Sequence, residues 1–119
     1  KYVLLDFWAS WCAPCIEDFP KLKSFHQKYP TELKIIGISR DENSERWKNA
    51  ILKYDLEKWS QVSLKENNNS KLQKEYFVNA IPTKVLIDPK GIIIGKWRGG
   101  GQQNMKELEE LLNQKKTYP

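Results

Sequence analysis

The chain has 119 residues, of which 39% are hydrophobic, and a formal net charge of +5 from 20 basic and 15 acidic side chains. This length suits a single domain with one core. The lysines are scattered rather than gathered in a run, which argues against nucleic-acid binding, and no stretch approaches the roughly 18 apolar residues of a membrane span. The chain shows no signal peptide and enters a predicted strand directly after Lys1. We therefore expect a trimmed mature domain, with any membrane anchor upstream.

Residues 2–8 are the first predicted element, an apolar run typical of a strand buried on both faces in a parallel sheet. Asp6 interrupts this run. A carboxylate buried there must be paired, hydrogen-bonded or neutralised, and burial raises its pKa. Perturbed carboxylates gather at reactive sites. We therefore interpret Asp6 as functional rather than as an acid that points to solvent at the strand end.

Cys12 and Cys15 are the only cysteines in the chain, and they open a helix predicted over residues 13–29. Apolar residues at helical spacing indicate this helix, and Pro14 falls in its first turn, where proline is tolerated. Two thiols at this spacing can close a disulfide. The free N–H groups and the dipole of a helix N-terminus favour a thiolate on the first cysteine. The pair therefore predicts redox exchange, with Cys12 ionised near neutral pH.

Other uses of a cysteine pair fit this sequence less well. A structural zinc site needs about four Cys or His ligands, whereas the chain has two cysteines and one histidine, His26. Attachment of a c-type haem needs His directly after the second cysteine, and Ile16 stands there. A purely structural disulfide is disfavoured because closing so short a loop removes little chain entropy. We expect no metal and no other cofactor.

The middle of the chain predicts one further strand and two helices. Residues 33–39 are rich in β-branched side chains and form a strand parallel to the first, because a helix joins the two. A helix starts at residues 41–43, and residues 59–64 are predicted as a loop or a short extended piece. A turn at Asn67-Asn68-Asn69 precedes a short helix that Ser70 opens as a capping box with Gln73.

The last third of the chain predicts a hairpin and a helix. Pro82 introduces a strand over residues 83–88, since the first position of a strand tolerates proline. A turn at residues 88–91 leads to an antiparallel strand at residues 92–97. Asn104 opens a final helix, whose apolar stripe is Met105, Leu108, Leu111 and Leu112.

These motifs together resemble the thioredoxin superfamily. The resemblance rests on residues 6–15 (Asp-Phe-Trp-Ala-Ser-Trp-Cys-Ala-Pro-Cys), on Pro20 and on Ile81-Pro82-Thr83 before the hairpin. The helical stretch before that last motif, and residues 88–91, look more like the extracytoplasmic, membrane-tethered thiol–disulfide reductases of the TlpA and ResA kind than like plain thioredoxin. The resemblance implies one α/β domain over residues 1–119, with a helical insertion at about residues 41–77 before the strand that follows the cis-proline.

The expected architecture is a thioredoxin fold with a four-stranded mixed sheet and helices on both faces. The expected strand order is 33–39, 2–8, 83–88, 92–97. The first two strands are expected to be parallel, and the last two antiparallel to their neighbours.

The resemblance also implies roles for individual residues. Cys12 would be the attacking thiolate and Cys15 the buried resolving thiol, the two closing a disulfide when oxidised. Asp6 would assist proton transfer with Cys15, and Pro82 would be a cis-proline packed against the disulfide. Asp18 matches an acidic position found in the ResA-like group and is a candidate modulator.

The expected substrate contacts surround these residues. Trp11 adjoins Cys12 and would shield it, and Ile81 would offer its backbone to an extended substrate. The lysine that partners the buried acid in thioredoxin aligns with Gly37, so we do not expect that ion pair here. The full predicted substrate-binding set is Trp11, Ala13, Pro14, Ile81 and Thr83.

The predicted function is that of an extracytoplasmic, for example periplasmic, thiol–disulfide oxidoreductase that reduces protein disulfides. Its partners would be a disulfide-bearing protein and an upstream thiol reductant. It would act as a monomer, without nucleic acid, and would touch a membrane only through a segment upstream of Lys1. Three alternatives stay open at this point. A peroxiredoxin-like peroxidase would consume hydrogen peroxide, a non-catalytic binding module of the same fold would show no thiol exchange, and a metal carrier would bind metal through both cysteines.

Overall fold

The computed structural model of the chain describes residues 1–67 and 71–117. Its central sheet has five strands, β1 (Tyr2–Trp8), β2 (Leu33–Ser39), β3 (Ser60–Ser63), β4 (Thr83–Ile87) and β5 (Ile93–Arg98). The helices are α1 (Ala13–Lys28), α2 (Ser44–Lys53), α3 (Lys71–Glu75) and α4 (Gln102–Thr117). None of the helices in the described part of the chain is long and apolar enough to cross a membrane.

The strand order is β3-β2-β1-β4-β5. β1 is parallel to β2 and antiparallel to β4, and β5 returns antiparallel to β4. The order and direction of the four predicted strands are therefore confirmed. β1 lies in the centre, so it is covered on both faces, which explains why its sequence is apolar almost throughout.

The prediction of only four strands was wrong, because residues 60–63 add β3 at the edge of the sheet beside β2. This strand has four residues and a single apolar side chain, Val62, so it carries no alternating pattern. Its pairing with β2 depends on backbone hydrogen bonds, which a pattern of side chains does not predict.

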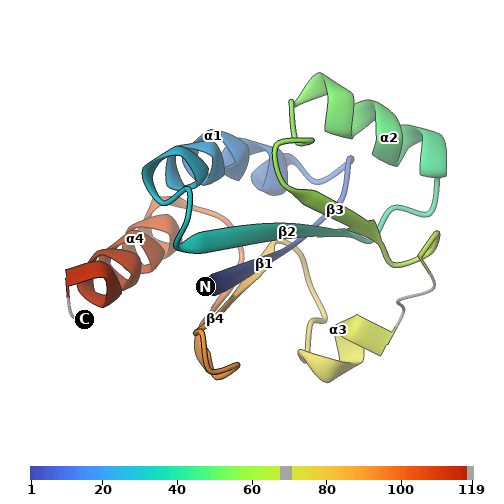
Figure 1. Ribbon diagram of the computed structural model, residues 1–119. Coiled ribbons are helices and arrows are strands. Elements are labelled where there is room, and N and C mark those ends of the chain that lie inside the picture. The colour runs from blue at the N-terminus through green and yellow to red at the C-terminus, as the bar shows by residue number, and fades with distance from the viewer. Residues whose placement is uncertain (68–70, 118–119) are drawn as a thin grey trace.

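Helices cover both faces of the sheet (Figure 1). On one face the larger core joins Leu4 and Trp8 of β1 to buried side chains of α1, α2 and α4. On the other face a smaller core gathers around Leu5 and Phe7 and takes in Leu72 of α3. Because side chains alternate along β1, Asp6 shares the face of Leu4 and Trp8, on which α1 lies.

Two predicted helix starts need comment. Helix α4 begins at Gln102, two residues before Asn104, which was wrongly expected to open it. The chain turns at Gly99 and Gly101, both with positive φ, so the helix can begin directly after them. The Asn104 amide instead donates to the carbonyls of Arg98 and Gly99 at 2.9 and 3.0 Å. The predicted Ser70 cap of α3, and Asn68 and Asn69 of the preceding turn, lie outside the described residues.

Candidate active site

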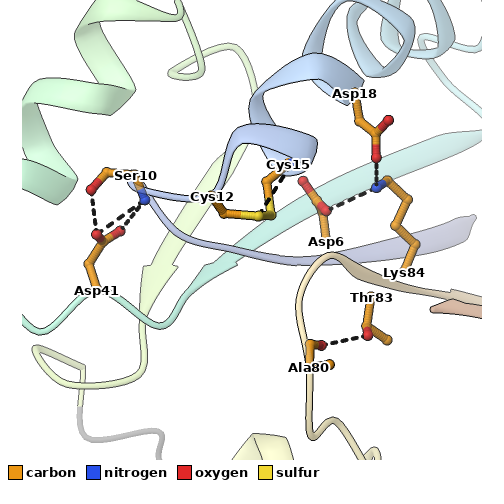
Figure 2. Close-up of a disulfide and its surroundings, with 9 residues drawn as sticks. All are labelled: Asp6, Ser10, Cys12, Cys15, Asp18, Asp41, Ala80, Thr83 and Lys84. Atoms are coloured by element: carbon orange, nitrogen blue, oxygen red, sulfur yellow. Dashed lines mark hydrogen bonds and ion pairs between the residues drawn. A yellow bond between two sulfur atoms is a disulfide. The ribbon is translucent and has the colours of Figure 1, made fainter. Parts of the chain in front are cut away.

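Cys12 and Cys15 are joined by a disulfide at the start of α1 (Figure 2). Cys12 is the N-cap, with extended backbone, and Cys15 lies in the first turn. Residues three apart in a helical turn lie on the same face, and the two Cα atoms are 5.3 Å apart. Both cysteines are largely buried, Cys12 to 5% and Cys15 to 1% exposure. Cys12 is thus slightly more exposed than Cys15.

The backbone around the disulfide favours negative charge on Cys12. The N–H of Cys15 donates to Cys12 Sγ at 3.3 Å. Ala13 supplies one more N–H that has no acceptor within the helix, whereas Pro14 has no N–H, and the positive end of the helix dipole lies at this terminus. In the reduced protein we expect the Cys15 N–H and the helix dipole to favour a thiolate at Cys12, which is the reactive form of a cysteine.

The loop before β4 lies against this first turn. The Ile81–Pro82 peptide bond is cis, Pro82 is buried, and the Pro82 carbonyl accepts a hydrogen bond from Gly99 N–H at 2.7 Å. A Cβ added to Gly100 would meet Pro14 at 3.1 Å and Pro82 at 3.6 Å. Gly100 therefore packs beside both prolines, and the start of α1, the cis-proline loop and the end of β5 meet around it.

The predicted substrate-binding residues do not all reach the surface. Trp11 is 62% exposed beside Cys12, Ala13 and Pro14 are exposed, and Ile81 is half-buried. Thr83 is buried, and its hydroxyl donates to the Ala80 carbonyl at 2.7 Å. The side chain of Thr83 thus stabilises the cis-proline loop from inside the protein rather than from its surface.

Asp6 belongs to a buried group of three charged side chains beneath α1 (Figure 2). Lys84 Nζ lies 2.7 Å from Asp18 Oδ2 and 3.6 Å from Asp6 Oδ1. Asp6 and Lys84 are paired residues of β1 and β4, and Asp18 reaches them from one helical turn beyond the disulfide. Sequence analysis singled out both acids, and the structure brings them together around one ammonium.

The pKa of Asp6 is raised above its ordinary value. Burial is the main cause, and Asp18 adds to it by repulsion, while the positive charge of Lys84 opposes the rise. Asp6 therefore holds a proton more firmly than a surface carboxyl, which suits a group that exchanges protons.

Lys84 was missed by sequence analysis, and the Gly37 alignment explains why. Gly37 does lie opposite Asp6, on β2, so no lysine comes from that side. The cation comes from the opposite neighbour, β4. One signal was available, because Lys84 is the only charged residue in the β4 segment Thr83–Ile87, just as Asp6 interrupts β1.

Asp41 was also missed as a site residue, although it was placed near the start of α2. Its buried carboxylate accepts hydrogen bonds from the backbone N–H and hydroxyl of Ser10 and from the hydroxyl of Ser39. These bonds attach the loop that leads into Cys12 to the end of β2. The helix cap is Asn43, which accepts from the Arg46 N–H at 3.0 Å.

No cluster of three or more His, Cys, Asp or Glu side chains that could hold a metal ion occurs within residues 1–67 and 71–117. The chemistry that these described side chains offer is that of two sulfurs, two buried acids and a buried ammonium.

Comparisons with known proteins agree with this geometry. A family model described as thioredoxin-like matches residues 1–93. The thiol-disulfide oxidoreductase ResA of Bacillus thuringiensis subsp. konkukian is 33% identical over 120 residues, which cover 100% of this chain and 65% of that protein. The chain thus spans just under two thirds of this relative's length.

Two solved structures show the same likeness. A thiol-disulfide oxidoreductase from Bacteroides fragilis is 35% identical, with a TM-score of 0.76 over 93% of this chain and 81% of that one. StoA from Bacillus subtilis is 27% identical, with a TM-score of 0.75 over 92% of this chain and 81% of that one.

Proposed function

Because the chain belongs to the thioredoxin-like family, we propose that it is a thiol–disulfide oxidoreductase in which Cys12 and Cys15 carry the exchange. The observation that carries this proposal is the Cys12–Cys15 disulfide at the N-terminus of α1, with the buried Asp6 side chain beside it (Figure 2). The similarity to several proteins named thiol-disulfide oxidoreductases supports it.

The reaction would proceed in two exchanges. The Cys12 thiolate attacks one sulfur of a partner disulfide, forms a mixed disulfide and releases the other partner sulfur as a thiolate. Cys15 then gives its proton to Asp6 and attacks Cys12, which closes the Cys12–Cys15 disulfide and releases the second partner sulfur. The partner gains two electrons and the dithiol loses two. An upstream thiol reductant must return them before the next turnover.

The direction proposed is reduction of disulfides in a protein substrate outside the cytoplasm. Disulfides form and persist in extracytoplasmic compartments, so a reductase of protein disulfides finds its substrates there. Exposed Trp11 and Pro14, together with half-buried Ile81, would form the surface on which an extended substrate segment lies. Such a substrate could reach Cys12 from this surface, whereas Cys15 lies deeper.

Trapping the mixed disulfide tests this function. The Cys15→Ser variant, reduced and mixed with a peptide that contains one disulfide, should accumulate a covalent adduct at Cys12, visible by mass spectrometry. The matched Cys12→Ser variant should form little adduct, and the unaltered protein should reduce insulin catalytically. Absence of both insulin reduction and a Cys12 adduct would overturn the proposal and would fit a non-catalytic module.

A further inference from the structure

Lys84 lies in an unusual place for a lysine. It is 2% exposed, is the second residue of β4, and lies opposite Asp6 on the face of the sheet that α1 covers. Lysine is almost never fully buried unless it is paired, because removing an ammonium from water is costly. Here it is paired with two carboxylates rather than one, and those acids come from different elements, β1 and α1.

The two contacts of Lys84 are unequal. Lys84 Nζ donates a hydrogen bond to Asp18 Oδ2 at 2.7 Å, whereas it lies 3.6 Å from Asp6 Oδ1. Asp6 Oδ1 is buried and accepts no hydrogen bond from any residue in the described part of the chain. The Lys84 ammonium therefore interacts more strongly with Asp18 than with Asp6.

Asp18 and Lys84 are the charged side chains that face Asp6 from the neighbouring elements within the described residues. On the β2 side, Asp6 faces Gly37, which carries no charge. From α1 it faces Asp18, and from β4 it faces Lys84. Asp18 borders a surface hollow whose other charged residues are Glu17, Lys21, Lys106 and Glu109. Lys21 and Glu109 form an ion pair with each other at 3.1 Å.

We propose that Lys84 is a positioning residue for the resolving step, an ammonium shared by two acids, so that Asp18 limits how much positive charge acts on Asp6. This inference rests on the function proposed above and adds to it a residue that governs when Asp6 can accept a proton. In that step the Cys15 thiol loses its proton to the Asp6 carboxylate. The new Cys15–Cys12 bond forms as the bond from Cys12 to the partner sulfur breaks.

The arrangement makes the two partners act in opposite directions. Removing Lys84 leaves the Asp6 carboxylate without a cation and makes it hold its proton more firmly. Removing the charge of Asp18 relieves repulsion and frees Lys84 for Asp6, so Asp6 should release its proton at lower pH. A lysine that only fills space in the core would not produce opposite shifts.

The test follows the Asp6 carboxyl by carbon-13 NMR in the oxidised protein, where no turnover is needed. The expected order of titration midpoints, from highest to lowest pH, is Lys84→Gln, the double variant Asp18→Asn/Lys84→Gln, the unaltered protein, and Asp18→Asn. Lys84→Arg should restore a midpoint close to that of the unaltered protein. Lys90→Gln, which removes an exposed lysine in the β4–β5 turn, is the matched control and should leave the midpoint unchanged.

The double variant also protects the test against misfolding. Lys84→Gln leaves the buried Asp18 carboxylate without its cation, and this variant could unfold. In the double variant position 18 is a neutral asparagine, so no unpaired charge is buried there. If Lys84→Gln does not fold, the proposal requires that the Asp6 titration midpoint of Asp18→Asn lie below that of the unaltered protein. The midpoint of the double variant must then lie above that of the unaltered protein. Shifts of Lys84→Gln and Asp18→Asn in the same direction, or no shift in either, would overturn the proposal.

A kinetic measurement separates this inference from the proposed function. The pH profile for release of the second partner sulfur from the mixed disulfide should move in the same order as the NMR midpoints. Absence of exchange in every variant, with the NMR order intact, would reject the function and keep the shared ammonium. Normal exchange with a single common pH profile would reject the role of Lys84 and keep the function.

Discussion

The Asp41 carboxylate receives both the backbone N–H of Ser10, at 3.0 and 3.1 Å to its two oxygens, and the Ser10 hydroxyl at 2.6 Å. Ser39 adds its own hydroxyl at 2.6 Å, and the hydroxyl oxygen of Ser39 accepts the Asp41 N–H. Asp41 is 4% exposed. One buried carboxylate thus joins the end of β2 to the loop two residues before Cys12.

Asp41→Ala should destabilise the protein and loosen the approach to Cys12. Hydrogen bonds to a charged group contribute about 1.5–3 kcal/mol each, and buried donors left unpaired add a penalty. We expect a loss of about 2–4 kcal/mol in the free energy of unfolding, measured with denaturant, together with faster alkylation of reduced Cys12. Glu42→Ala, at the exposed neighbour, is the control and should change neither value much. Equal stability of the two variants would show that the Asp41 bonds contribute little.

Asp6→Asn should stabilise the protein, by an amount that depends on pH. The pKa of Asp6 is raised in the folded state from its ordinary value of 3.8. The folded state therefore binds the proton more tightly than the unfolded chain does. The stability gained from this binding is complete below pH 3.8 and is lost as the pH rises through the folded-state pKa. Asparagine has no such titration, and Lys84 keeps Asp18 as its partner in this variant.

The measurement is urea unfolding of oxidised Asp6→Asn and unaltered protein across the acid-to-neutral range. Each unit by which the pKa is raised corresponds to about 1.4 kcal/mol. The free energy of unfolding of the variant should therefore rise relative to that of the unaltered protein as the pH rises, and then keep a constant advantage whose size depends on how far the pKa of Asp6 is raised. An advantage that grows toward acid pH would contradict the raised pKa.

Much of this site could be predicted from local sequence. The cysteine pair, the prolines at positions 14 and 82 and the interrupting Asp6 each leave a short-range signal: a spacing, a tolerated position or a break in an apolar run. The same is true of β1, β2, β4 and β5, whose apolar runs and turn residues fix their type and, with the chain connections, their order.

The rest depends on register between distant segments. Lys84 meets Asp6 only because β1 and β4 pair with a particular offset, and nothing near either residue specifies that offset. Asp41 and Ser10 are 31 positions apart and meet at the strand ends for the same reason. β3 is recognisable only once β2 is present as its partner. Sequence patterns thus predict which side chains are buried more readily than which buried groups face each other.

Asp6→Asn should also slow the second exchange of the proposed reaction. Without the carboxylate, Cys15 must lose its proton to water before it can attack the mixed disulfide. General base catalysis contributes about 10²–10⁴-fold, and we expect a loss near the lower end at neutral pH. The difference should shrink toward alkaline pH, where a thiol of ordinary pKa, about 8.5, ionises unaided.

Stopped-flow release of a chromophoric thiol from a preformed Cys12 mixed disulfide would measure this second exchange directly. The first exchange, attack by Cys12 on the chromophoric disulfide, provides an internal control and should change far less. An unchanged rate of the second exchange at neutral pH would make Asp6 a structural residue.

Phe77→Asn should make the protein more stable although it removes a large apolar side chain. Phe77 has φ of +54° and is 77% exposed. A left-handed backbone costs an L-residue about 1–2 kcal/mol, and Asn tolerates this conformation best among non-glycine residues. Against this gain stands the Lys96 ammonium, 5.8 Å from the ring centroid, a contact worth about 0.5–1 kcal/mol at an exposed site. We expect a net gain of about 0.5–1 kcal/mol in the free energy of unfolding, measured in urea.

The control is Ile92→Asn, at an exposed apolar residue outside the positive-φ positions, which should change stability by less than about 0.5 kcal/mol. A clear loss of stability in Phe77→Asn, with Ile92→Asn neutral, would mean that contacts of the Phe77 ring outweigh the backbone strain.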